Sequence, residues 1–249
     1  MTMRDLLVRG MLAGIIASVF ALGFAFLVGE PPIEQAIAIE EVGGAAHSHD
    51  AAPTVAASVA HEDAPSVSRN VQRTIGLAAG MLGLGVAFGG IFAIVFAFAR
   101  GRLGITSDRG TAFAVAVLTF VAIYLVPFLK YPANPPAVGQ EETMVARTAA
   151  YVGLLVISVL LMIAAVMLQR SLAALRSGWD ATILAALAFG AVVVAIALVL
   201  PGFAEVPEGF PVDVLWHFRL ASFGTQLTMW LGIGLAFGLL TERASRARR

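Results

Sequence analysis

Histidine and carboxylate side chains gather in three polar stretches of the sequence. The stretches are 30–73, 130–147 and 205–219, and together they hold all 4 histidines of the chain. Imidazole combined with carboxylate suits late first-row divalent cations such as cobalt, nickel and zinc. The candidate metal ligands are Glu30, Glu34, Glu41, His47, His49, Asp50, His61, Asp213 and His217. They predict one face of the protein that gathers a divalent cation.

Most of these candidates lie in the first polar stretch, which divides into two parts. Residues 31–42 are predicted to form a short helix, because Pro31 and Pro32 suit a first helical turn and Glu34 lies near the positive end of its dipole. At about 3.6 residues per turn, Glu34 and Glu41 share one face of that helix. This face either presents two carboxylates to a cation or belongs to an amphipathic helix lying on the membrane surface.

The second part, 43–68, is rich in Ala, Ser, Pro, His and acidic residues and has little to bury, so we predict a disordered loop. It places imidazole beside carboxylate at His49 and Asp50, and again at His61. A flexible site of this kind binds metals weakly and without selectivity. Metal capture and a passive tether therefore stay open as alternatives for this loop.

The polar stretches must be positioned by membrane helices. Hydrophobic residues make up 59% of the chain and charged residues 13%, which indicates a multi-pass membrane protein. The apolar runs 10–29, 74–99, 110–129, 148–169, 181–204 and 220–241 each approach or exceed the ~20 residues that cross a bilayer as a helix. We therefore predict an all-α fold with six transmembrane helices in a single membrane domain over 1–249. The first run is interpreted as a retained helix and not as a signal peptide.

Most of the 16 Lys and Arg residues fall on the side of the membrane that also holds both termini. By the positive-inside rule we predict cytoplasmic termini, a location in the cell (inner) membrane, and an external position for the polar stretches. The runs that end near residues 29, 129 and 204 each lead into proline-rich sequence. Proline cannot donate a backbone hydrogen bond, so stiff helix caps are predicted at these ends.

Several other kinds of chemistry are excluded by the sequence. The chain has no cysteine, so thiolate metal sites and iron–sulfur clusters are ruled out. No P-loop, HExxH motif or nucleophile–base pair is present, and we predict neither enzyme activity, nor a tightly bound cofactor, nor nucleic-acid binding. Ser222, Thr225, Gln226 and Met229 form a polar stripe on the sixth run, where helix packing and a solute path are both open. The small-xxx-small spacings from Gly76 to Gly80 and from Gly85 to Gly89 indicate close helix packing.

Three segments resemble one known family. They are 29–40, the proline-rich block 124–139 and 218–222, and they are similar to the proposed cobalt transporter family CbtA, in the form seen in actinobacteria. The resemblance implies a membrane protein for cobalt uptake, with Co²⁺ (or Ni²⁺ or Zn²⁺) as the transported ion. It also implies the lipid bilayer and a small, single-helix, histidine-bearing protein (CbtB-like) as partners. The alternative is a non-transporting scaffold that stabilises a separate permease, and the oligomeric state is left open.

Overall fold

The computed structural model describes residues 2–48 and 68–246 of the chain. Within these ranges every regular element is helical, and six helices are long and apolar enough to cross a membrane. Their spans are Met3–Val42, Arg69–Ala99, Asp108–Lys130, Glu141–Ala173, Gly178–Val199 and Val212–Arg246. The predicted all-α fold with six membrane-crossing helices is confirmed.

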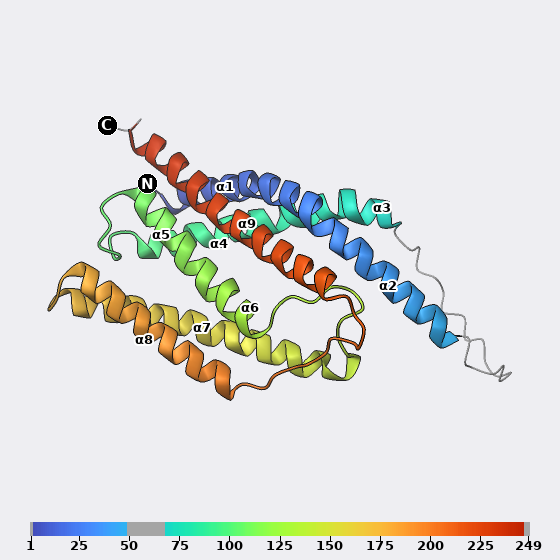
Figure 1. Ribbon diagram of the computed structural model, residues 1–249. Helices are drawn as coiled ribbons and strands as arrows, with labels where there is room; N and C mark the ends of the chain where they lie inside the picture. The colour runs from blue at the N-terminus through green and yellow to red at the C-terminus, as the bar shows by residue number, and fades with distance from the viewer. Residues whose placement is uncertain (1, 49–67, 247–249) are drawn as a thin grey trace.

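Several of these spans combine more than one helical element. The first contains α1 (Met3–Phe24), the π-helical turn η1 (Ala25–Gly29) and α2 (Glu30–Ser48); the second contains α3 (Arg69–Val71), η2 (Gln72–Gly76) and α4 (Leu77–Ala99). The third contains α5 (Asp108–Phe120), the π-helical turn η3 (Val121–Leu125) and α6 (Val126–Lys130). The last three are η4 (Glu141–Thr143) with α7 (Met144–Ala173), α8 (Gly178–Val199), and α9 (Val212–Arg246). Both termini lie at one end of the molecule, and we call the opposite end, where α2, α3 and the start of α7 lie, the distal end (Figure 1).

The helices α1, α4, α5 and α9 pack into a four-helix body. Its tightest crossing joins α1 to α4 through glycines. A Cβ atom added to Gly14 would lie 1.8 Å from the Gly85 carbonyl oxygen, and one added to Gly10 would lie 2.2 Å from that of Gly89. Only glycine allows two helix backbones to approach this closely. The packing predicted for Gly85 and Gly89 is therefore present, with α1 as the partner. The packing predicted for Gly76 and Gly80 is not found among the described residues, because a Cβ atom added to Gly80 would meet nothing within 4 Å and one added to Gly76 would meet only the Val71 carbonyl oxygen, one turn earlier, at 3.4 Å.

Large side chains fill the rest of the body. Phe92, Phe96, Trp230 and Phe237 are almost completely buried. The rings of Phe92 and Phe96 meet that of Phe237 edge to face, with centroids 5.2 Å and 4.8 Å away. This is the geometry that aromatic rings prefer, because the positive ring edge faces the negative ring face. The body is a packed core, and the two cavities described below lie beside it.

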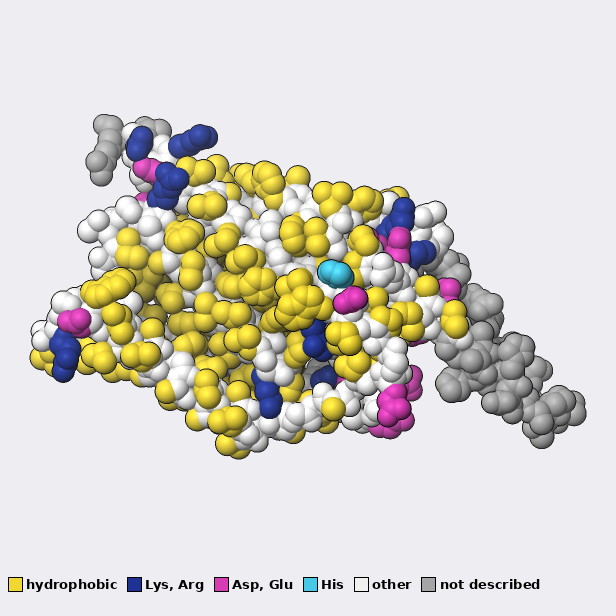
Figure 2. Space-filling view, in the orientation of Figure 1, with side chains coloured by type: hydrophobic (Ala, Val, Ile, Leu, Met, Phe, Trp, Pro, Cys, Tyr) yellow, Lys and Arg dark blue, Asp and Glu magenta, His cyan; other side chains and the backbone are white. Residues whose placement is uncertain are grey.

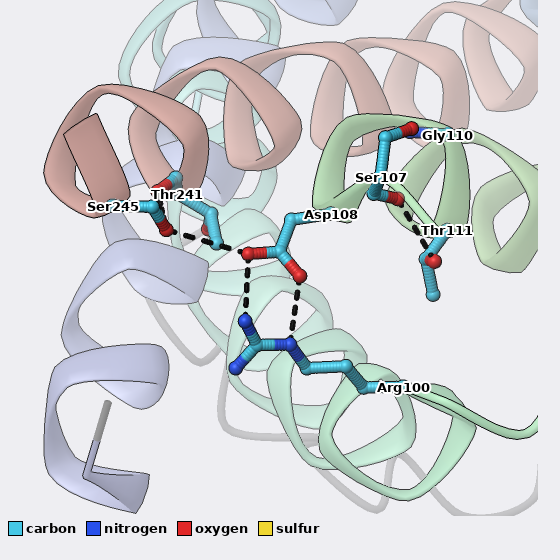
Figure 3. Close-up of polar contacts among 7 residues, drawn as sticks. All are labelled: Arg100, Ser107, Asp108, Gly110, Thr111, Thr241 and Ser245. Carbon is cyan, nitrogen blue, oxygen red and sulfur yellow. Dashed lines mark hydrogen bonds and ion pairs between the residues drawn. The ribbon is translucent and has the colours of Figure 1, made fainter. Parts of the chain in front are cut away.

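A polar network ties three helices of the body together at the terminal end (Figure 3). The Arg100 guanidinium donates two hydrogen bonds of 2.7 Å and 2.8 Å to the Asp108 carboxylate, joining the end of α4 to the start of α5. Ser245 of α9 donates to the same carboxylate at 3.4 Å. Ser107 caps α5 by accepting from the Gly110 N–H. This network fixes the ends of α4, α5 and α9 relative to one another.

The hairpin of α7 and α8 lies beside the body and is much less embedded in it (Figure 1). Only 11% of the hydrophobic stretch of α7 and 6% of that of α8 is buried, against 28% to 44% in the other spans. Helix α8 packs chiefly on α7, and α7 reaches the body mainly at η3 and α6. We call this line of contact the seam. On the face drawn in Figure 2, hydrophobic side chains cover much of the surface between the charged groups at the two ends.

The prolines affect the helices differently from the prediction. Pro31 and Pro32 do not cap the first span, because the helix continues through them to Ser48. A π-helical turn stands just before these prolines, and another stands just before Pro127. Such turns accommodate a missing backbone donor inside a membrane helix. By contrast, α8 ends at Val199, before Pro201, with Leu200 extended.

The predicted loop 43–68 is in part helical, because α2 continues to Ser48. The rest of that loop, 49–67, lies outside the described residues.

Candidate functional site

The structure positions the predicted metal ligands unevenly. His49, Asp50 and His61 lie outside the described residues, and His47 belongs to the last turn of α2. Glu30, Glu34 and Glu41 all lie on α2, with Glu41 exposed. Asp213 and His217 are one turn apart at the start of α9, and both are exposed to solvent or lipid. In the described ranges no group of three His, Asp or Glu side chains is close enough to hold a metal ion.

Two of the candidate carboxylates on α2 pair with arginines that follow the connection 49–67 in the sequence. The Glu30 carboxylate is only 7% exposed and accepts a 2.6 Å hydrogen bond from Arg69. The Glu34 carboxylate, one turn later on α2, pairs with Arg73, one turn after Arg69. The Nε atoms of both arginines are buried without a hydrogen-bond partner among the described residues. The two pairs form an ion-pair ladder that keeps two carboxylates together on α2.

A third carboxylate, Glu205, was not among the predicted ligands. It is only 5% exposed and accepts hydrogen bonds from the Thr143 hydroxyl and the Arg147 guanidinium. These contacts tie the connection between α8 and α9 to the start of α7. Arg147 and Glu205 are 58 residues apart, so no local sequence spacing indicated their pairing.

The proline-rich block after the third span is held by Arg219 of α9. Its Nε donates to the Ala133 carbonyl at 3.3 Å, and an Nη atom donates to Asn134 Oδ1 at 3.1 Å. No carboxylate among the described residues forms an ion pair with this arginine. The segment most characteristic of the family resemblance is thus fixed to the sixth span by an arginine with neutral partners.

A polar pocket of about 450 Å³ lies at the distal end of the seam. Its polar lining includes Tyr124, Tyr131, Asn134, Arg147, Tyr151 and Ser222. The Tyr124 and Ser222 hydroxyls are 3.0 Å apart, and the Tyr131 hydroxyl donates to the Pro201 carbonyl at 2.9 Å. Burial raises the pKa of the Tyr131 hydroxyl above its ordinary value. Hydroxyl and amide groups, with the Arg147 guanidinium, make up its polar lining, and among the described residues no acid or histidine lines it.

A second cavity, also of about 450 Å³, lies further along the seam toward the terminal end. Its lining is almost wholly apolar, with Leu118 and Val121 on one side and Met162 on the other. Gln169 of α7 and Thr182 of α8 supply its two polar side chains. The hydrophobic surface of this part of the molecule is visible in Figure 2.

Three distal segments meet through apolar contacts. Ala36 of α2, Val138 of the third-span connection, and Phe210 and Val214 near the start of α9 form one small buried cluster. This cluster brings α2, the proline-rich block and α9 together. His217 lies exposed on α9 and is not drawn into a group with Glu30 and Glu34.

The stripe predicted on the sixth run is divided among separate contacts. Ser222 lines the polar pocket, whereas the Thr225 hydroxyl donates to the Ala221 carbonyl of its own helix at 2.8 Å. Met229 is buried, and its sulfur lies 3.9 Å from the Ser18 hydroxyl of α1. Helix packing therefore accounts for Met229 and a bond within α9 for Thr225, whereas Ser222 lines a cavity.

Comparison with known proteins gives one result. No curated protein and no solved structure matches the chain significantly. The family model for CbtA, described as a probable cobalt transporter subunit, matches residues 3–242, which takes in the first five spans completely and the sixth up to residue 242. The chain therefore belongs to the CbtA family of probable cobalt transporter subunits.

Proposed function

We propose that this protein is the membrane subunit through which a divalent transition-metal cation, Co²⁺ in the first place, is taken up into the cell. The family match over residues 3–242 carries this proposal. The positive-inside rule supports an external distal end with cytoplasmic termini. On this orientation the carboxylates of α2 and the exposed Asp213 and His217 face the side from which the ion arrives.

The ion-pair ladder supports a role for Glu30 and Glu34 in receiving the ion. Both carboxylates lie on one face of α2, and each is paired with an arginine. A divalent cation would compete with these arginines for the two carboxylates. The arginines hold the two carboxylates in place when no cation is bound, because adjacent unpaired acids repel each other. Glu41, His47, His49, Asp50 and His61, further along the same polar stretch, would concentrate the ion near the ladder.

A small partner protein bearing histidine fits this arrangement. The described part of the chain offers carboxylates and hydroxyls at the distal end but does not assemble imidazoles with them. Cobalt binds imidazole well, and a single-helix partner of the CbtB type would supply that ligand. The exposed faces of α7 and α8 offer room for such a helix within the membrane.

Uptake of labelled Co²⁺ by cells that express the chain tests the proposal. Uptake in excess of the empty-vector level is expected, and the Glu30→Gln, Glu34→Gln double variant is expected to lose most of the excess. Glu208→Gln is the matched control, because Glu208 is an exposed carboxylate in the connection between α8 and α9. Equal uptake by the double variant and the wild type, at equal protein levels in the membrane, would remove Glu30 and Glu34 from the site.

The alternative function is a scaffold that stabilises a separate permease. It is favoured by the lack of a three-ligand metal group among the described side chains. A scaffold would raise the amount or activity of its permease and move no ion itself. Co²⁺ uptake that occurs only when a distinct permease is co-expressed would favour this alternative.

A further inference from the structure

The polar side chains of α7 within the membrane all lie on one stripe. Between Arg147 and Gln169 the polar residues of this helix are Thr148, Tyr151 and Ser158. Thr148 and Tyr151 line the polar pocket, and Gln169 lines the apolar cavity. Residues at these spacings share one face of a helix. The stripe therefore runs the length of the seam and connects the two cavities.

Ser158 lies on this stripe between the two cavities. It is completely buried, and its hydroxyl has no hydrogen-bond partner among the described residues. Ser18, another buried serine, has carbonyl oxygens of Gly14 and Met81 within 2.9 Å. A buried hydroxyl without a partner is costly, and its retention calls for an explanation such as a water, an ion or another transient partner.

The body has a matching irregularity at the same level. Val121 lines the apolar cavity and Tyr124 lines the polar pocket, and both belong to the π-helical turn η3. Helix α7 contacts the body at η3. On the body side, the two cavities are thus lined by residues of one π-helical turn, and π-helical turns occur frequently at functional sites.

The packing of the four-helix body also favours the seam over other helix contacts as the place where the molecule opens. The α1–α4 crossing is closed by backbone contact at Gly10 and Gly14, and aromatic rings fill the space near Phe237. At the seam, α7 buries only Leu154 and Ser158. Separating α7 from η3 breaks few contacts, and this makes the seam the easiest place for the molecule to open.

We propose that the solute path runs along the seam between the four-helix body and the α7–α8 hairpin, with Ser158 and η3 at its narrowest point. The proposal rests on the proposed function for the identity of the solute, a partly hydrated divalent cation. Hydroxyl oxygens of Tyr151 and Ser158 and the amide oxygen of Gln169 would replace part of its water shell. The Arg147 charge at the mouth is compensated by Glu205, so this pair presents no net positive charge.

Cysteine accessibility tests this path, because the chain has no cysteine of its own. Single variants Tyr151→Cys, Ser158→Cys and Gln169→Cys are placed on the seam. Val156→Cys and Leu160→Cys are controls on the same helix, since these side chains are 50% and 60% exposed on the lipid side. Each full-length protein is reconstituted in lipid vesicles and treated on both sides with a charged methanethiosulfonate reagent. This reagent modifies thiols that water reaches.

We expect the three seam cysteines to react several-fold faster than both control cysteines, and Co²⁺ to slow the reaction at Ser158→Cys. The path is overturned if Ser158→Cys reacts no faster than Val156→Cys and Leu160→Cys in well-folded protein. Serine to cysteine is nearly isosteric, and the elution profile of each variant in detergent checks its folding.

A blocking variant separates this inference from the proposed function. Ser158→Leu is expected to abolish most Co²⁺ flux, and Val156→Leu to leave it unchanged. If wild-type flux is present but Ser158→Leu transports normally, the path is wrong and the transport function stands. If the wild type moves no Co²⁺ with or without a small partner, the transport function fails regardless of the labelling result.

Discussion

The Glu30 carboxylate on α2 accepts a 2.6 Å hydrogen bond from Arg69, and this contact joins the two sides of the connection 49–67. Glu34 and Arg73 repeat the contact one turn further along each helix. Two of the acids that the sequence offers as metal ligands, Glu30 and Glu34, are therefore held in ion pairs. In the proposed function, an arriving cation replaces the arginine as the partner of each carboxylate.

Removing the exposed arginine of the ladder is expected to strengthen metal binding. Arg73 and Glu34 are 37% and 46% exposed, and exposed pairs contribute about 0.2–1 kcal/mol. Arg73→Gln therefore frees Glu34 with little loss of stability and should raise Co²⁺ affinity by up to about fivefold. Calorimetric titration of the purified protein measures this change. Arg246→Gln, which removes an exposed ion pair at the terminal end, serves as control, and an equal effect of both variants would contradict the prediction.

The pair of Arg69 and Glu30 should behave differently because Glu30 is buried. The Arg69→Ala variant leaves a carboxylate unpaired at 7% exposure. Breaking a buried pair by removing one partner costs about 3–5 kcal/mol, and we expect Arg69→Ala to lie near the lower figure because Arg69 is itself partly exposed. A lower Tm in detergent than that of Arg73→Ala is the expected result. Equal Tm values would show that water reaches Glu30.

Glu205 is expected to be essential for the attachment of the α7–α8 hairpin. Glu205→Ala leaves the partly buried Arg147 without its carboxylate and the Thr143 hydroxyl without its acceptor. A destabilisation of about 3 kcal/mol is expected, measured by thermal unfolding. Glu208→Ala, in the same connection but exposed, should have little effect. Similar unfolding of the two variants would argue against this role of Glu205.

The α1–α4 crossing predicts a contrast between two glycines. Gly14→Ala places a Cβ atom 1.8 Å from the Gly85 carbonyl oxygen, whereas Gly80→Ala meets nothing within 4 Å. Overpacking of this kind costs about 1–3 kcal/mol. Gly14→Ala should therefore unfold at a lower denaturant concentration than wild type, and Gly80→Ala should match wild type or exceed it. Retention of wild-type stability by Gly14→Ala would show that the two helices separate freely.

Much of the fold could be predicted from the sequence, because apolar runs in a membrane have few alternatives to helices. The spacing of Gly85 and Gly89 also indicated a close crossing, although not the partner. The continuation of the first helix through Pro31 could not be predicted, since it depends on a π-helical turn that has no simple sequence signature. The loose attachment of the α7–α8 hairpin could not be predicted either. It follows from tertiary packing, and all apolar runs are alike in composition.

The candidate site was less predictable for a similar reason. Residue type alone placed Glu30 and Glu34 among metal ligands, but the pairing with Arg69 and Arg73 spans 39 residues. The sequence drew attention to the stripe on α9, whereas the stripe on α7 faces both cavities. Thr148, Tyr151, Ser158 and Gln169 are too widely spaced along the chain to form a conspicuous motif. Their common face becomes visible only where the helix meets η3.

Flux measurement on the purified protein distinguishes a transporter from a scaffold. The protein is reconstituted in vesicles that contain a Co²⁺-sensitive dye, alone and with the small histidine-bearing partner, beside protein-free vesicles. The proposed function predicts Co²⁺ entry above the protein-free level in at least one of the two preparations, and a clear reduction in the Glu30→Gln, Glu34→Gln variant. Entry no faster than in protein-free vesicles, with and without the small partner, would contradict it.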